Sequence, residues 1–309
     1  MRQLLAVDGG QSAIRVRHSS LDHAVDVEGV SRLEGDTAGS VADAIVRGWR
    51  DAGAVATDRV VMGLTTAPTD GETRQRLCAM VAGQIEAPEV WLADDAVTGH
   101  AGALSLGPGI SVIVGTGVAC LAMSADRPAR LIGGHGYLIG DEGGGFWIGS
   151  AGVRAVTQAM DGRGPATALV ELADAHFGGL ASLGDRLHSS ARPVDTIARF
   201  APRVLEAGAA GDAVAAAITD AAVDELVTLV QAAGRHAATA DATVPLALGG
   251  RLLADGPLRE RLDRALARDL PDIVARSADG SPLDGALLLG GSDEPGRYRD
   301  LVYVWGGAT

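Results

Sequence analysis

Apolar and polar positions in the first hundred residues change between the spacing of strands and that of helices. Residues 4–7 (LLAV) form an apolar run that stops at Asp8-Gly9-Gly10, and residues 14–20 (IRVRHSS) resume with alternation. This pattern predicts a β-hairpin with a glycine turn. Helical spacing over 38–53 and 74–85 separates strand-like runs at 59–67 and 89–95, and a further helix is expected over 96–104.

A similar order returns in the second half of the chain. Residues 109–117 (GISVIVGTG) predict a strand that ends in a glycine turn, with 118–124 as its hairpin partner. Helical pattern runs from 150 to 242, followed by a strand at 244–250 and helices at 258–270 and 281–290. We expect two α/β lobes, 1–105 and 106–309; a single decorated α/β domain is the alternative. The tail after Gly291 is expected to be only partly ordered.

Composition excludes several classes of protein. The 309 residues contain arginine but no lysine, which excludes a P-loop and a pyridoxal phosphate Schiff base. A net charge of −13 argues against a nucleic-acid partner. We find neither a signal-peptide pattern nor an apolar run of membrane-spanning length, so we expect a cytoplasmic protein without a membrane partner. Cys78 and Cys120 lie in apolar surroundings and are interpreted as buried, inert thiols.

Three apolar strands end in glycine turns: AVDGGQS, IVGTGVA and ALGGRLL. Glycine lets backbone N–H groups approach an anion closely, so three such turns suggest a bound nucleotide. Asp8 opens the first turn, where a carboxylate could hold Mg²⁺ against phosphate oxygens; taken alone, an ordinary turn-forming role is the better interpretation. A dinucleotide fold is excluded because G-x-G-x-x-G is absent after the first strand.

Two further segments concentrate acids. Asp94 and Asp95 are adjacent at a strand end, so one can face a site while the other caps the following helix. Residues 133–149 (GGHGYLIGDEGGGFWIG) surround Asp141 and Glu142 with glycine. Phe146 and Trp147 beside them are read as core residues rather than as a sugar-stacking face. His100 and His135 lack the spacing of metal ligands.

The motifs resemble those of the BadF/BadG/BcrA/BcrD-type ATPases, and among them the N-acetylglucosamine and glucosamine kinases. VDGGQS is similar to the first phosphate motif, LADDAVTGHAGA to the segment of the catalytic Asp and VIVGTGVAC to the second phosphate motif. GGHGYLIGDEGGGFWIG, LALGGRLLADGPL, SPLDGALLLG and the helical segment 197–218 also match in order. Departures are Gln11-Ser12, Val118, and the lack of the usual sugar-contacting Asn in 30–37.

The resemblance implies a two-lobed actin-like ATPase (ribonuclease H-like) fold, with ATP and Mg²⁺ in a cleft between the lobes. It implies Asp95 as the general base for a sugar kinase that phosphorylates the 6-hydroxyl of an amino sugar or related hexose, and a homodimer. The implied nucleotide contacts are Asp8 (also the metal ligand), Gly9, Gly10, Gln11, Ser12, Gly115, Thr116, Gly117, Gly249 and Gly250. The implied sugar contacts are Thr66, Asp95, Gly134, His135, Asp141 and Glu142.

Two other functions stay open. One is an activase-type ATPase with an iron–sulfur cluster, which Cys78 and Cys120 fit poorly because they do not occupy that group's cysteine positions. The other is a non-catalytic, sugar-sensing regulator of the same fold. For Glu142, support of the loop and organisation of hydrated Mg²⁺ are both open.

Overall fold

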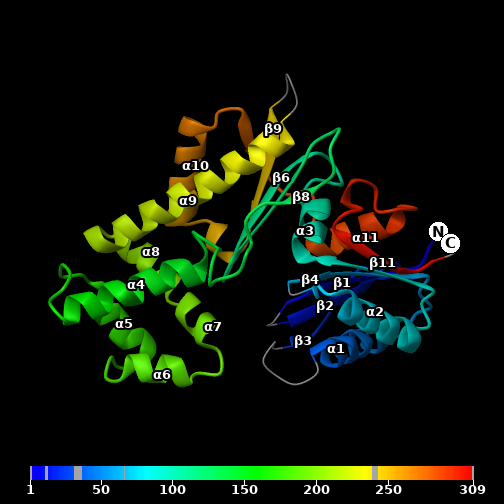
Figure 1. Ribbon diagram of the computed structural model, residues 1–309, viewed down its shortest axis with the longest axis horizontal. Helices are drawn as coiled ribbons and strands as arrows, with labels where there is room; N and C mark the ends of the chain where they lie inside the picture. The colour runs from blue at the N-terminus through cyan, green and yellow to red at the C-terminus, as the bar shows by residue number, and fades with distance from the viewer. Residues whose placement is uncertain (1, 11–12, 31–36, 66, 239–242, 308–309) are drawn as a thin grey trace. The chain divides into compact units, whose positions relative to one another are not determined.

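The computed structural model describes residues 2–10, 13–30, 37–65, 67–238 and 243–307, and the chain divides into two compact units (Figure 1). The first unit comprises Met1–Ser111, Leu121–Arg130 and Ser277–Thr309, and the second comprises Val112–Cys120 and Leu131–Arg276. Residues 277–309 therefore belong to the first unit, whereas the sequence pattern assigned them to the second lobe, 106–309.

The first unit is built on a six-stranded sheet in the order β11-β5-β4-β1-β2-β3. Its strands are β1 (Leu4–Gly9), β2 (Ala13–His18), β3 (Val25–Glu28), β4 (Arg59–Leu64), β5 (Glu89–Asp94) and β11 (Val302–Gly306). Strand β1 is antiparallel to β2 and parallel to β4, which is parallel to β5. The carboxyl ends of β1, β4 and β5 consequently lie at one edge of the sheet.

Helices cover both faces of this sheet. Helices α1 (Thr37–Asp51) and α2 (Gly71–Ile85) lie on one face, and α3 (Asp95–Ala103) and α11 (Pro282–Gly291) on the other. Because strand side chains alternate between faces, Leu5 and Val7 pack with α1 and α2, whereas Ala6 packs in the core formed with α3 and α11. The same alternation points Asp8 toward the face of α3.

The prediction of a partly ordered tail is wrong for most of it. Residues 302–306 form β11, which pairs antiparallel with β5 so that Val302 lies opposite Ala93. The buried Arg59 guanidinium helps to hold the start of this segment, donating hydrogen bonds to the carbonyl oxygens of Gly290 and Ser292, each 2.6 Å away. The alternating VYVW pattern is strand-like, and β5 supplies the unpaired backbone groups that it needs.

The second unit contains a five-stranded sheet in the order β10-β9-β6-β7-β8. The strands are β6 (Gly109–Val114), β7 (Val118–Met123), β8 (Arg130–Leu131), β9 (Val244–Gly249) and β10 (Ile273–Arg276). The outer ends of β6 and β7 fall in the first unit by the division above. The turn between these two strands, residues 115–117, belongs to the second unit.

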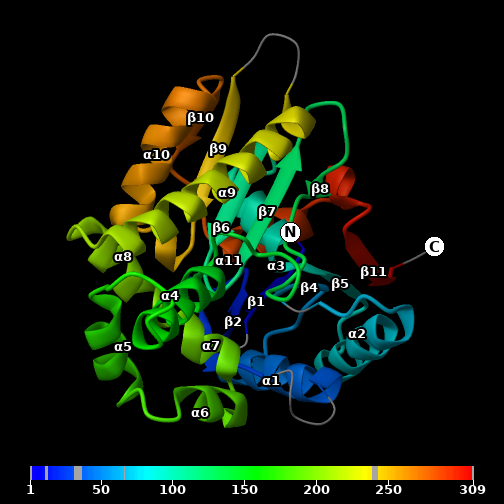
Figure 2. The same cartoon turned by 60° about the vertical axis from the view of Figure 1, so that its left-hand side comes forward.

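The helices that accompany this sheet in the described residues are α4 (Gly145–Met160), α5 (Leu169–Phe177), α6 (Leu183–Ser189), α7 (Pro193–Ala198), α8 (Ala201–Ala209), α9 (Ala213–Ala237) and α10 (Pro257–Asp269). Short 3₁₀ turns occur at Arg251–Leu253 here and at Gly296–Tyr298 in the first unit. Figure 2 shows α9 running along the sheet, with α10 beside it. Within the described ranges, no helix has both the length and the apolar character needed to cross a bilayer.

Candidate active site

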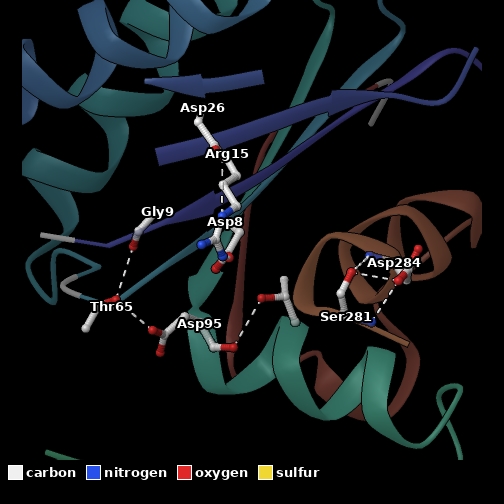
Figure 3. Close-up of polar contacts among 9 residues, drawn as sticks. Asp8, Gly9, Arg15, Asp26, Thr65, Asp95, Ser281 and Asp284 are labelled. Atoms are coloured by element: carbon white, nitrogen blue, oxygen red, sulfur yellow. Dashed lines mark hydrogen bonds and ion pairs between the residues drawn. The ribbon is translucent and has the colours of Figure 1, made fainter. Parts of the chain in front are cut away.

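In the first unit, Asp8 and Asp95 lie at the edge where the parallel strands end (Figure 3). Asp8 is on β1, and Asp95 is the first residue of α3, directly after β5. Asp94 is the N-cap of that helix, and its side chain accepts a hydrogen bond from the Ala96 amide at 3.0 Å. Asp94 thus caps the helix while Asp95 contacts Thr65, in agreement with the prediction that one of the two adjacent acids is the cap.

Thr65 joins these strand ends, and the sequence analysis did not single it out. Its hydroxyl donates to Asp95 Oδ2 at 2.6 Å and lies 3.2 Å from the carbonyl oxygen of Gly9, which also accepts from the Thr65 amide at 2.9 Å. Its position could have indicated this role, because Thr65 follows β4, and β4 lies between β1 and β5 in the sheet. Thr65 therefore fixes the carboxylate of Asp95 relative to the first glycine turn.

The surroundings of Asp8 favour a positive charge. Burial and the nearby Asp95 raise the pKa of Asp8, while Arg15 lowers it. Arg15 lies opposite Asp8 on β2 and is 3.5 Å from its carboxylate and 3.4 Å from Asp26. A partly buried carboxylate beside a second carboxylate is relieved by a divalent cation, so Asp8 fits a ligand of partly hydrated Mg²⁺.

In the second unit, the turn at 115–117 is held by the start of α4. The Gly145 amide donates to the Gly115 carbonyl at 2.8 Å, and the Phe146 amide donates to the Thr116 carbonyl at 2.8 Å. These are two of the amides that a helix start leaves without an intrahelical partner. They also explain why α4 begins at Gly145, five residues before the helical region expected from 150.

The loop of residues 133–144, called here the acidic glycine loop, lies against the same turn. The Asp141 carboxylate accepts hydrogen bonds from the backbone of Val118 and Gly136, and a Cβ atom at Gly117 would overlap Asp141 Oδ2. Burial, the larger effect, raises the pKa of Asp141 even though these amides lower it. The glycines thus allow two backbone segments to pack directly on one another.

Gly250 also lies beside this turn. A side chain there would overlap the backbone of Val114, the residue that ends β6, and the φ of Gly250 is +93°. Only glycine tolerates this conformation and this approach readily. The second unit therefore brings Gly249-Gly250, Gly115–Gly117 and the acidic glycine loop together.

Other residues of the acidic glycine loop are less constrained. Gly134, His135 and Glu142 are exposed. Phe146 and Trp147 are half-buried rather than fully in the core, and the Phe146 ring contacts Tyr137 edge-on at 5.1 Å. Gln11, Ser12 and Thr66, together with most of the 30–37 segment, lie outside the described residues.

The remaining cysteine and histidine candidates have structural surroundings. Cys78 and Cys120 are free and buried, and burial raises the pKa of each thiol to about 12. His100 is buried and hydrogen-bonded: its ring lies 2.8 Å from the Tyr298 hydroxyl and 3.3 Å from the Gly109 carbonyl oxygen. Burial lowers the pKa of His100 to about 4, so it is neutral at pH 7. Among the residues that the structure describes, His, Cys, Asp and Glu form no group of three suited to a metal.

Each unit has a glycine turn at the end of an apolar strand, and the first unit also has a pair of neighbouring carboxylates. Such features occur in proteins that bind nucleotides. The chain belongs to the BadF/BadG/BcrA/BcrD ATPase family, whose model matches residues 8–290.

Relatives of this chain include kinases. It is 29% identical over 177 residues to the N-acetylmuramic acid/N-acetylglucosamine kinase of Clostridium acetobutylicum. The aligned region covers 55% of this chain and 58% of that protein. The matched part thus spans a little over half of the length of that relative.

Solved structures match over nearly the whole chain. A provisionally assigned N-acetylglucosamine kinase from Chromobacterium violaceum matches with a TM-score of 0.72 and 28% identity, covering 94% of this chain and 99% of that one. A ROK family glucokinase from Streptomyces griseus, solved with glucose and AMPPNP, matches with a TM-score of 0.56 and 17% identity over 92% of this chain and 97% of that one. These matches confirm the predicted actin-like sugar kinase fold, with a sheet in each unit.

Proposed function

We propose that this protein is an ATP-dependent sugar kinase that phosphorylates the 6-hydroxyl of N-acetylglucosamine, glucosamine or a related hexose. The observation that carries the proposal is the position of Asp95 at the start of α3, where Thr65 holds its carboxylate at 2.6 Å. Family membership and the kinase relatives support the same activity.

In the proposed reaction, Asp95 accepts the proton of the sugar hydroxyl. The hydroxyl oxygen attacks the γ-phosphorus of ATP, the bond to the bridging oxygen breaks, and ADP leaves with the electron pair of that bond. Phosphoryl transfer depends mainly on positioning and charge neutralisation, so a fixed carboxylate is the principal chemical group that the protein must supply. Thr65 keeps the Asp95 carboxylate oriented before substrate arrives.

The glycine turns supply the proposed phosphate contacts. Mg²⁺ held by Asp8 would neutralise phosphate charge. Gly9, Gly10, Gln11 and Ser12 would line the phosphate site, where the Gly10 amide itself donates to the Ala13 carbonyl at 2.9 Å. Gly115, Thr116 and Gly117 would contact the β- and γ-phosphates, and Gly249 with Gly250 would lie under the adenosine. Space is open around Gly115, where an added Cβ atom would meet nothing within 4 Å.

The proposed sugar contacts are Asp95, Thr66, Gly134, His135, Asp141 and Glu142. Carboxylates accept hydrogen bonds from sugar hydroxyls, and the exposed His135 and Glu142 are accessible to a ligand. The name of the Clostridium relative makes N-acetylglucosamine the first sugar to test.

A coupled assay of ADP release tests the activity. Purified protein with ATP and Mg²⁺ is offered glucosamine, N-acetylglucosamine, N-acetylmannosamine, N-acetylmuramic acid and glucose, and NMR of the product identifies the phosphorylated hydroxyl. We expect ADP release with at least one amino sugar and phosphate on its 6-oxygen. No ADP release from any of these sugars would favour a sugar-sensing regulator, and phosphate on another oxygen would contradict the 6-hydroxyl assignment.

We also propose that the protein is a homodimer. Size-exclusion chromatography with light scattering should give twice the chain mass of 31.3 kDa. A mass of one chain across micromolar concentrations would contradict this.

A further inference from the structure

The acidic glycine loop is fixed from behind by α9. Gly133 and Gly143 both have positive φ, and Cβ atoms there would lie 2.9 Å from Leu229 Cδ1 and 2.8 Å from Leu226 Cγ. The two ends of the loop are therefore packed closely on a long helix.

Asp141 has an unusual backbone within this loop. Its φ is +60°, in the left-handed region, and its carbonyl accepts the Gly144 amide at 2.9 Å. A Cβ atom at Gly144 would lie 2.9 Å from that carbonyl and 3.1 Å from Gly117 Cα. The tight turn of 141–144 thus places the Asp141 side chain toward residues 117–118.

The two ends of the 115–117 turn are held by different groups. Amides at the start of α4 bind the carbonyls of Gly115 and Thr116, whereas the Asp141 carboxylate accepts from the backbone of Val118. Without Asp141, the side of the turn that leads into β7 would lose this charged acceptor.

We propose that Asp141 is a positioning residue for nucleotide binding: its carboxylate holds residues 117–118 so that the amides of Thr116 and Gly117 in the 115–117 turn point at phosphate. The Gly115 amide takes no part, because it donates to the Gly117 carbonyl at 2.9 Å. This inference rests on the proposed function, because it takes that turn to bind phosphate. It gives Asp141 a role that does not require sugar, in addition to the proposed sugar contact. A carboxylate has enough acceptor positions for both.

The test is the binding of Mg²⁺ and AMPPNP, measured by calorimetry without sugar. Asp141→Ala and Gly117→Ala should each raise the dissociation constant about tenfold, the loss expected for one charge-assisted hydrogen bond. Asp141→Asn retains an acceptor oxygen and should lose less. The double variant should bind about as weakly as either single variant, because both changes break the same contact.

Gly184→Ala is the matched control for the added methyl group. Gly184 is in α6, has no positive φ and would place its Cβ in open space, so binding should stay as in the wild type. Near-UV circular dichroism and the unfolding midpoint establish that each variant is folded.

Two results would overturn the inference alone. One is an Asp141→Ala variant that binds AMPPNP like the wild type and shows only a raised KM for sugar. The other is a double variant whose losses add, because Gly117→Ala would then act on the ligand directly. Failure of the wild type to bind AMPPNP would instead remove the proposed function itself.

Discussion

The two units hold their candidate chemistry in different ways. In the first unit, side-chain oxygens of Asp8, Thr65 and Asp95 meet at the ends of parallel strands. In the second unit, backbone groups of residues 115–118 are held by helix amides and by Asp141, with glycine at the close approaches. Substitutions that change a side-chain functional group should therefore impair the site of the first unit. Substitutions that add a methyl group to a glycine should impair the site of the second unit.

The largest expected effect is on catalysis, from Asp95→Asn. Loss of a general base costs about 10²- to 10⁴-fold in turnover, while the amide leaves the shape of the site unchanged. ADP release should fall by that factor, and AMPPNP binding should change by less than about threefold.

Asp161→Asn provides the control, because this exposed carboxylate pairs only with Arg163 among the contacts described for it. It should leave turnover unchanged. Near-wild-type turnover of the Asp95→Asn variant would contradict the assignment of the base.

The next effect should come from a methyl group added in the second unit, by Gly145→Ala. The new Cβ would lie 2.8 Å from the carbonyl oxygen of Gly115, a backbone atom that cannot move aside cheaply. Overpacking of this kind costs about 1–3 kcal/mol, and here the strain falls on the turn proposed to bind phosphate.

We expect Gly145→Ala to weaken AMPPNP binding about tenfold in calorimetry, by displacing the 115–117 turn. Unchanged affinity together with a lowered unfolding midpoint would show that the close approach supports stability alone.

Thr65→Val should give a smaller loss. It removes the hydroxyl that donates to Asp95 at 2.6 Å while keeping a similar volume. A hydrogen bond to a charged group is worth about 1.5–3 kcal/mol, and part of this is recovered by water because Thr65 is exposed.

Turnover of Thr65→Val should fall about threefold to fivefold, and Thr65→Ser, which keeps the hydroxyl, should retain most of the activity. Equal turnover in both variants would mean that Asp95 does not depend on Thr65 for its orientation.

The same contrast explains how far the sequence could predict the site. Local patterns predicted that Asp8 and the Asp94–Asp95 pair lie at strand ends and that one of the pair caps a helix, and the glycine turns stood out because they interrupt apolar runs. The choice of Asp95 over Asp94 as the base came from the family resemblance. Thr65 was missed because its role depends on the order of strands in the sheet. The contact of Asp141 with Val118 joins residues far apart in sequence, which no local spacing reveals.

The fold shows the same limit. The principal strands and helices follow the hydrophobic pattern, whereas the short strands β3, β8 and β10 carry little pattern of their own. Helix α4 starts within a run of glycines, against their low helix propensity, because the Gly115 and Thr116 carbonyls bind its first amides. The tail forms β11 only because β5 presents an unpaired edge.

The smallest expected effect concerns the support of α3 by α11 in the first unit. Gly102 and Gly285 allow these helices to pack closely, since a Cβ at either would overlap the backbone of the other segment. In the first turn of α11, Asp284 forms a capping box with the N-cap Ser281 and binds Arg17 of β2 at 2.6 Å. These hydrogen bonds, first that with Ser281, lower the pKa of Asp284 to about 2.

Because its pKa is lower in the folded state than the ordinary value near 3.9, ionised Asp284 stabilises the fold above about pH 4. This contribution should disappear as the pH falls from about 4 to 2. The side chain is 41% exposed, so solvent screening reduces the expected loss for Asp284→Asn to about 1 kcal/mol at pH 7. Urea unfolding at pH 7 and at pH 3 should show a smaller difference from the wild type at the lower pH. As the control, Asp293→Asn changes a fully exposed carboxylate and should show almost no difference from the wild type at either pH. If Asp284→Asn instead lost the same stability at both pH values, the effect would come from packing rather than from charge.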